Sequence, residues 1–268
     1  MLNIDCILFG SLIKLVLREN KMIINLMYHD VFVHDTNESG FQRERDLPYK
    51  MNASMFEKHV KSISDYCEFT HLSKNHVVFT FDDGGKSFHQ VIAPILEKYG
   101  FKGLFFITTQ YVGTNTFLNE EEIRDLHSRG HIIGSHAHTH KHLYTLTDEQ
   151  VEDEWKCSTE ILSRILGEPI KYASIPNGDS SKRVLANAYK YGIRYIYTSE
   201  PITKVSYFND MQVIGRYVLL SDSSTEYVMS IITSSKKRIL LRSKRAVLKI
   251  IKTILGSNYV KLKNLLFR

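Results

Sequence analysis

The chain has 268 residues, which suits one large α/β domain, and its 43% apolar and 24% charged residues exclude an intrinsically disordered protein. Its three cysteines are an odd number and lie far apart, so they predict no disulfide framework and permit a reducing compartment. The net charge of +6 is uneven. Residues 236–268 carry eleven Lys/Arg and no Asp/Glu, which leaves 24 basic and 29 acidic residues, or −5, in residues 1–235.

The N-terminal segment is predicted to be an extension, at 1–21. Residues 7–17 are mostly apolar. The residues before them include Asp5 and no Lys or Arg, and no cleavage site of small residues follows, so a signal peptide is not predicted. The run is also shorter than the ~20 residues that a membrane span needs. We expect a cytoplasmic protein, for which Met22 is an alternative start.

Strands and helices are predicted to alternate from residue 22 onward. In chain order, the sequence predicts a strand at 22–28, a polar loop at 34–50, a helix at 54–66, a strand at 77–81, a helix ending at Gly100, a strand at 103–107, a helix after Asn119, a strand at 132–133, a helix at 147–166, a strand at 171–175, a helix at 180–191, and strands at 193–198 and 212–219. This alternation indicates a parallel sheet. We predict a single α/β domain with a distorted or incomplete (β/α) barrel, in which polar residues that follow strands gather at one rim.

Capping residues mark several of the helix starts. Ser54 with Glu57, and Thr147 with Gln150, have the spacing of a capping box. Asn119 is a good N-cap in front of three acidic residues, which suit the helix dipole. Pro94 predicts a kink in the helix that ends at Gly100.

Two adjacent acids, Asp82 and Asp83, end the apolar strand at 77–81 and precede two glycines. Neighbouring strand residues point to opposite faces, so one acid can hold a metal while the other moves a proton. An ordinary acidic turn is the alternative, because Asp and Gly are common in turns.

Four histidines lie within seven residues of one another: His136, His138, His140 and His142. Neutral imidazole is the commonest metal ligand, and two histidines four residues apart can bind one ion. The pairs His136/His140 and His138/His142 both have this spacing, and a solvated His-rich loop is the alternative. One Asp and two His would form a three-ligand site with an open position for water, as in catalytic zinc sites.

These two segments resemble the polysaccharide deacetylase family, also called the NodB-homology or carbohydrate esterase 4 family. The family's first motif, T-F-D-D-G, matches residues 80–84. The resemblance implies that Asp82 is the general base and that Asp83 binds a divalent metal, with Zn²⁺ the default from the ligand types. It also implies a seven-stranded, TIM-like barrel of the NodB type.

The second motif of the family, G-N-H-[ST]-x-x-H-P-x-L, aligns with Gly134 and Leu143. By this resemblance His136 and His140 are the other two metal ligands, and the neighbouring histidines are not. Ala137 replaces the usual Ser or Thr, and Lys141 replaces the usual Pro. Neither difference removes a metal ligand.

The third motif, R-x-P-x-G or A-x-P-x-G, corresponds to residues 174–178. The resemblance implies that the backbone N–H of Asn177, after Pro176, helps to hold the oxyanion, whereas a plain turn is the alternative. Ser174 occupies the position where an Arg often pairs with the catalytic Asp. Arg216 is a candidate replacement, against the alternative of a surface or structural Arg.

The general acid is predicted at His29. The family's last motif, Leu-x-Ile-x-His, is not evident, since no histidine follows residue 142. The strand at 22–28 ends in Met27-Tyr28-His29, which resembles the circularly permuted subgroup that includes biofilm poly-N-acetylglucosamine deacetylases. That resemblance implies that His29 protonates the leaving amine, and a structural histidine after a strand is the alternative.

The basic tail, 236–268, follows a predicted catalytic domain at 22–235. Apolar residues recur in it at helical spacing: Val247, Ile250, Ile251, Ile254 and Leu255. Such a helix can lie on an anionic membrane surface, which would place the protein at the inner membrane face, or it can dock its apolar stripe on the barrel. Nucleic acid is not a predicted partner, because no nucleic-acid module precedes the tail.

The resemblance implies a hydrolase that removes N-acetyl groups from acetamido sugars and releases acetate. Residues 198–201, Thr-Ser-Glu-Pro, resemble deacetylases of surface polysaccharide assembly, which implies a surface polysaccharide or its precursor as the N-acetylated glycan substrate. The alternatives are an O-acetyl esterase or other amide hydrolase of the same fold, and a non-catalytic glycan-binding module.

Overall fold

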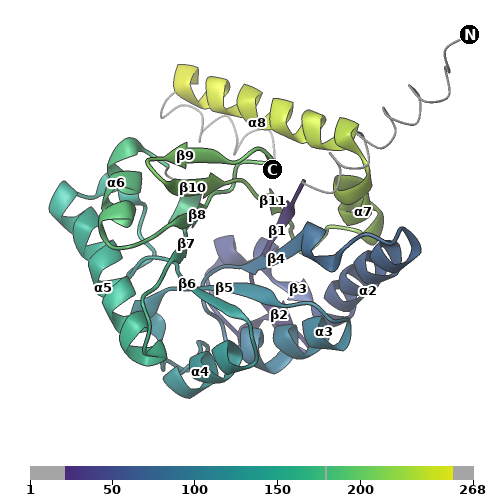
Figure 1. Ribbon diagram of the computed structural model, residues 1–268, viewed down its shortest axis with the longest axis horizontal. Coiled ribbons are helices and arrows are strands. Elements are labelled where there is room, and N and C mark those ends of the chain that lie inside the picture. Colours follow the sequence, from purple (N-terminus) through teal and green to yellow (C-terminus); the bar gives the residue numbers. More distant parts are fainter. Residues whose placement is uncertain (1–21, 179, 256–268) are drawn as a thin grey trace, which may run out of the picture.

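The computed structural model describes residues 22–178 and 180–255, with side chains described as far as residue 251. The predicted N-terminal extension and the end of the basic tail therefore lie outside the described residues. A curved sheet forms the centre of the molecule (Figure 1). Its strands are β1 (Ile24–Tyr28), β4 (Val77–Phe81), β5 (Gly103–Ile107), β6 (Ile132–Ser135), β7 (Tyr172–Ser174), β8 (Tyr195–Tyr197), β9 (Ser206–Phe208), β10 (Met211–Ile214) and β11 (Tyr217–Val218).

The sheet is an incomplete barrel, as the sequence predicts, but in the described residues it has nine strands and not the seven that the resemblance implied. Its strand order is β11-β1-β4-β5-β6-β7-β8-β10-β9. Neighbouring strands are parallel except for β9 and β10, which are antiparallel. The two edge strands, β11 and β9, do not pair with each other, so the barrel stays open between them. A small second sheet joins β2 (Val31–Phe32) to β3 (Met51–Asn52).

Helices cover the outer face of the curved sheet (Figure 1). They are α2 (Ala53–Phe69), α3 (Ala93–Lys98), α4 (Glu120–Ser128), α5 (Asp148–Leu166), α6 (Lys182–Lys190), α7 (Thr225–Thr233) and α8 (Ser235–Leu255). Because helices lie outside and side chains fill the inside, the strands β1 and β5 are buried along their whole length. This accounts for their continuous apolar sequences, which differ from the alternating pattern of a half-exposed strand.

Aromatic rings pack the core between β4 and the helices. Phe81 lies with its ring centroid 5.2 Å from Phe105, 5.7 Å from Tyr28 and 5.7 Å from Phe56. All four rings are fully or almost fully buried. The core therefore fixes the end of β4, from which the two acids Asp82 and Asp83 continue.

The predicted helix starts are confirmed at two positions and wrong at a third. Thr147 with Gln150 forms the expected capping box of α5, and Asn119 caps α4. Ser54 does not cap a helix: Asn52 does, with its Oδ1 accepting from the Ser54 N–H at 2.9 Å. The helix begins earlier because Asn52 offers the same kind of cap, and Ala53 then fits the first turn.

Pro94 lies where a helical irregularity was predicted. Residues 88–92 form a π-helical turn, and α3 follows with Pro94 as its second residue. Since proline has no N–H to donate, it fits the junction between the two hydrogen-bonding patterns.

The predicted strand at 212–219 is two strands, β10 and β11, separated by Gly215 and Arg216. A Cβ on Gly215 would lie 2.4 Å from the carbonyl oxygen of Glu200, so two backbones pack closely there and the strand breaks. The sequence also did not predict β9 or α7. The exposed residues of β9 explain its weak signal, since they show no apolar pattern.

Residues 235–255 form α8, but the alternative that the apolar stripe docks on the barrel is wrong for two of its described side chains, whereas a third, Ile251, is half-buried. Val247 and Ile250 are 53% and 59% exposed. The side of α8 that packs on the core includes Leu241. Ile254 and Leu255 lie beyond the described side chains.

Candidate active site

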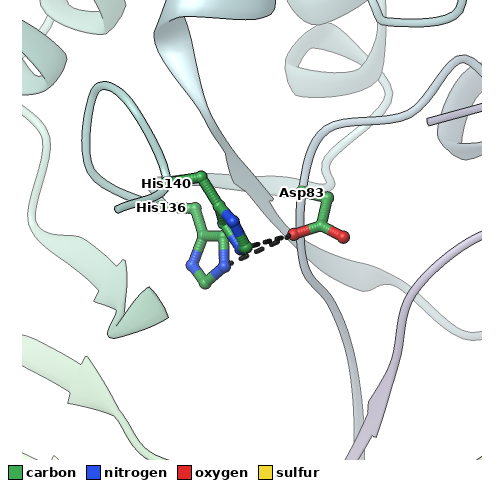
Figure 2. A group of neighbouring side chains, drawn as sticks. All are labelled: Asp83, His136 and His140. Carbon is green, nitrogen blue, oxygen red and sulfur yellow. Dashed lines mark ion pairs between the residues drawn. The ribbon is translucent and has the colours of Figure 1, made fainter. Parts of the chain in front are cut away.

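Three side chains from two loops converge at the carboxyl ends of the strands (Figure 2). Asp83 follows β4, and His136 and His140 lie on the loop after β6. Asp83 Oδ1 lies 3.1 Å from His140 Nε2 and 3.5 Å from His136 Nε2. One ligand atom from each residue lies within 4.8 Å of the others, so a single ion can contact all three.

Ser174 orients the ring of His136. The ring nitrogen Nδ1 lies 3.1 Å from the carbonyl oxygen of Ser174 and 2.5 Å from its Oγ. Because a carbonyl only accepts, Nδ1 carries the proton, and the lone pair of Nε2 faces Asp83. Burial lowers the pKa of His136 to about 4, and Asp82 only partly opposes this. The ring is therefore neutral at neutral pH, as a metal ligand must be.

Asp82 lies beside the same cluster, with Oδ2 4.0 Å from His136 Nε2, and is paired with Arg216. The guanidinium donates to Asp82 Oδ1 at 2.6 Å and to Oδ2 at 2.8 Å, and Ser174 Oγ donates to Oδ1 at 3.1 Å. Both charged groups are almost fully buried. Burial by itself would raise the pKa of Asp82, but Arg216 and then His136 outweigh it and lower that pKa below its usual range.

This pairing bears on the two alternatives for Arg216. With 1% of its surface exposed, Arg216 is not a surface residue. It reaches Asp82 from the loop between β10 and β11, at the strand break that the sequence did not predict.

Asp83 is ionised as well, and its backbone conformation is unusual. Burial would raise its pKa, but His140, followed by His29 and His136, lowers it well below the usual range. Its φ is 86°, in the left-handed region that few non-glycine residues adopt. Such strained residues persist where the surrounding structure fixes them, and they cluster at functional sites.

The histidine loop is held from behind by Glu154 of α5. This buried carboxylate accepts hydrogen bonds from the backbone N–H groups of His138 and Thr139, both at 2.8 Å, and from Thr139 Oγ1. Ala137 and His140 have φ values of 58° and 62°. Glu154 thus stabilises a strained turn that brings His136 and His140 to the same point.

Spacing left two histidine pairs open, and the structure separates them. His138 turns away from Asp83, and its Nδ1 lies 2.9 Å from Thr109 Oγ1. His142 lines the pocket but does not belong to the group of possible ligands. Only the pair His136/His140 shares a point with an aspartate among the described residues.

His29, the predicted general acid, lines the same pocket as the two aspartates. Its ring lies 4.5 Å from that of Tyr49, centroid to centroid, and its buried Nδ1 has no hydrogen-bond partner among the described residues. His29 also lowers the pKa values of Asp82 and Asp83.

The predicted oxyanion residue, Asn177, lies at the wall of this pocket, next to the buried Pro176. Its φ is 57° and its Nδ2 lies 3.5 Å from the carbonyl oxygen of His140. The Pro-Asn-Gly turn therefore lies against the histidine loop.

The pocket has a volume of about 430 Å³ and takes much of its wall from the polar loop at 34–50. Arg43, Arg45, Asp46 and Tyr49 line it from this loop, and Arg245 lines it from α8. Arg43 is paired with Asp46 at 2.6 Å, and Arg245 lies 3.4 Å from Glu200. The sequence predicted only that this loop is long and polar. It did not predict that Arg245 of the basic tail lines the pocket.

Buried contacts anchor the loop beside the metal-binding residues. Asp30 accepts from Ser39 Oγ at 2.6 Å and from Ser87 Oγ at 3.0 Å. Lys50 Nζ donates to the carbonyl oxygens of Thr36 and Ser39 at 2.6 and 2.5 Å. These contacts join the loop to the segment that follows Asp83.

The donor set of Asp83, His136 and His140 fits a divalent cation. Asp83 is ionised and His136 is neutral, as ligands must be, and the second nitrogen of His136 is fixed by a carbonyl, as is usual for metal-binding histidines. His140 Nδ1 is buried with no partner among the described residues. Two nitrogens and one carboxylate oxygen suit zinc and related ions.

The sequence of residues 70–196 matches the model of the family described as polysaccharide deacetylase. Peptidoglycan-N-acetylmuramic acid deacetylase PdaA of Bacillus subtilis is 30% identical over 125 residues, which are 46% of each chain. Peptidoglycan-N-acetylglucosamine deacetylase of Bacillus cereus is 28% identical over 120 residues, 44% of this chain and 41% of the relative. The chain spans about half the length of the curated relatives it matches.

Two solved structures have the same fold. The Streptococcus pyogenes deacetylase PplD, in complex with acetate, superposes with a TM-score of 0.66 at 21% identity, over 78% of this chain and 97% of that one. A polysaccharide deacetylase from Bacillus cereus gives 0.65 at 21% identity, over 80% and 69%. At this identity the similarity establishes the barrel architecture.

Proposed function

The chain belongs to the polysaccharide deacetylase family, and from this premise we propose that it is a metal-dependent hydrolase of N-acetylated glycans. It would remove N-acetyl groups from acetamido sugars of a surface polysaccharide or its precursor and release acetate. One observation carries the proposal. Asp83, His136 and His140 form a cluster fit for a divalent cation, beside a second, ionised carboxylate in the same pocket.

The reaction adds water across an amide, forming a C–O bond at the acetyl carbon and breaking its C–N bond. A cation held by the three ligands would acidify water and polarise the acetamide carbonyl. Asp82, held in position by Arg216, would accept the proton of the water. His29 would donate a proton to the departing amine, and the Asn177 N–H would stabilise the oxyanion.

The central experiment is an assay of the metal-loaded protein on a panel of acetylated sugars. We expect acetate and a free amine in equal amounts from N-acetylated oligomers, loss of both with a chelator, and recovery with Zn²⁺. Because three arginines line the pocket, the panel includes a lipid-linked acetamido glycan that carries phosphate. Acetate without amine, from O-acetylated sugars only, would instead identify an esterase. Glycan binding without acetate at any metal loading would identify a binding module.

Substitution of the two aspartates separates their roles. Asp82→Asn should retain the metal and lose roughly 10²–10⁴-fold in kcat, because it removes only the proton acceptor. Asp83→Ala should lose both metal and turnover. Metal content by elemental analysis and acetate release measure the two effects, and full activity of either variant would contradict the assignment.

Matched controls test the ligand set itself. His140→Ala should lower metal affinity roughly 10-fold to 100-fold or more, whereas His142→Ala, in the same loop and lining the same pocket, should keep the metal. Asp65→Asn changes an exposed acid on α2 and should alter neither property.

A further inference from the structure

The exposed apolar side chains of the described structure are concentrated on α8. Of the eleven large apolar residues that are exposed, five lie on this helix, with 44% to 64% of their surface accessible: Ile239, Leu240, Val247, Leu248 and Ile250. Ile239, Leu240, Val247 and Ile250 fall on one side of the helix at 100° per residue. A group of exposed apolar side chains on one side of a helix indicates an interaction site.

The opposite side of α8 is fixed to the barrel, so the apolar side faces outward. Arg238 donates to the carbonyl oxygens of Ile231 and Ile232 at 2.7 and 2.9 Å, at the end of α7. Leu241 packs on the core, and Arg245 lies 3.4 Å from Glu200. In Figure 1 the helix runs along the edge of the molecule past β9, β10 and β11, and no helix of the described residues covers its outer side.

The charge of α8 selects the kind of partner. Residues 236–251 contain seven Lys/Arg and no Asp/Glu. Arg242 and Lys244 are exposed beside the apolar side chains. A second copy would bring two cationic helices together, which is unfavourable, whereas an anionic lipid surface offers both negative charge and an apolar layer.

We propose that α8 binds the surface of an anionic lipid bilayer, with its apolar side at the headgroup–acyl boundary and its Lys/Arg residues among the phosphates. In the described residues, no helix combines the length and apolarity needed to cross a membrane, which agrees with a helix that lies in the interface. This binding does not depend on the proposed function. If that function holds, Arg245 links α8 to the pocket, and lipid-linked glycans would reach the pocket at the membrane surface.

The test measures binding of the full chain to sedimented vesicles. We expect binding to vesicles of phosphatidylcholine with phosphatidylglycerol, weaker binding to phosphatidylcholine alone, and weakening by salt. The double variant Val247→Ser/Ile250→Ser keeps every charge and should lower the apparent affinity at least about tenfold. Phe69→Ser, which changes an apolar residue that is 87% exposed at the end of α2, is the matched control and should bind as the parent does.

Two results would overturn the proposal. One is absence of binding to anionic vesicles, for example because a second copy covers α8. Light scattering identifies the second copy, as a dimer that the double variant dissociates. The other is a double variant that binds vesicles as tightly as the parent. Acetate release from a soluble acetamido sugar should be the same in the parent and the double variant, so a failed deacetylase assay and failed lipid binding remain distinguishable.

Discussion

Arg216 sets the charge and the position of Asp82. A buried carboxylate without a partner would be protonated at neutral pH, because burial disfavours the charged form. The two hydrogen bonds from Arg216, at 2.6 and 2.8 Å, outweigh the effect of burial on the pKa of Asp82 and fix both of its carboxylate oxygens. The pair thus keeps an ionised acceptor in place beside the ligands, although a low pKa makes it a weak base that depends on an acidified water.

Replacing Arg216 should therefore move the pH profile of the enzyme. Arg216→Lys keeps a positive charge but loses the two-pronged contact, so the pKa of Asp82 rises. Since Asp82 must be ionised to accept a proton, the acidic limb of the kcat/KM profile should shift to higher pH. At neutral pH the rate should fall roughly tenfold to a hundredfold. Arg194→Lys, a half-exposed arginine paired with Asp210, is the control, and an unmoved acidic limb in Arg216→Lys would disprove the dependence.

Local sequence predicted the residues of the site when several motifs pointed to the same chemistry. Asp82, Asp83 and a pair of histidines could be proposed because acids and histidines each follow a strand, whereas only the family resemblance chose His136 and His140 over His138 and His142. Arg216 was harder to place, since its contact spans 134 residues of sequence and depends on a strand break that no pattern indicated. Glu154 did carry a signal, because an acid on the buried side of an amphipathic helix needs a partner.

Among the elements, α5 supports the metal-binding loop through Glu154. Its carboxylate accepts two backbone N–H groups at 2.8 Å each, and those donors would otherwise be unpaired in a turn with left-handed residues. The element therefore contributes to the site although it carries no ligand, as outer-sphere residues commonly do.

Weakening the contacts between Glu154 and the histidine loop should lower the affinity of the site for the metal. Glu154→Gln removes the charge that strengthens both backbone hydrogen bonds at Oε2 and places its NH2 group against Thr139 Oγ1, and we expect the metal Kd to rise roughly tenfold. Glu154→Ala should raise it further. Titration with a metal indicator measures Kd, and Glu160→Gln, an exposed acid on the same helix, should bind metal as the parent does. Equal affinities of all three variants would show that the loop does not need α5.

Elements with strong local signals were predicted close to their observed bounds, and those held by distant contacts were not. The capped helices α4 and α5 and the apolar strands β4 and β5 are examples of the first kind. The strand β11 has two residues and exists because it pairs with β1, at Leu26–Tyr217 and Met27–Val218. No periodicity can appear in two residues, so tertiary pairing alone defines them.

For the molecule as a whole, buried neutral histidines make stability depend on pH. His131 accepts the Gly103 N–H at Nδ1, at 2.9 Å, and its Nε2 lies 3.1 Å from Glu97. Burial lowers the pKa of His131 to about 4, with Glu97 only partly opposing it, and burial lowers that of His59 similarly, to about 4. Both rings are therefore neutral in the folded barrel at neutral pH.

The sign of the pH effect follows from these pKa values. The unfolded chain protonates its histidines near a pKa of 6.5, whereas the folded chain does so only near 4. Between these values the unfolded state binds more protons, so the stability is fully present above about pH 6.5 and is lost as the pH falls toward 4. Glu97, whose pKa is lowered to about 2 by Arg129, contributes a separate loss only below its unfolded value of 4.5, so measurements above about pH 5 report the histidines.

The variant His131→Asn isolates one of these groups, because Asn Oδ1 can still accept the Gly103 N–H but does not titrate. It should be less stable than the parent at about pH 7, since it loses the contact with Glu97, yet its stability should fall less between about pH 7 and 5. For the parent ring the full loss, completed nearer pH 4, is at most about 3 kcal/mol. Urea unfolding with a chelator present measures the free energy of unfolding at each pH. The contributions of His136 and His59 are the same in both proteins and cancel when the two are compared. Parallel stability curves for the two proteins would mean that the pKa of His131 is the same in the folded and unfolded chains, which would contradict the effect assigned to burial.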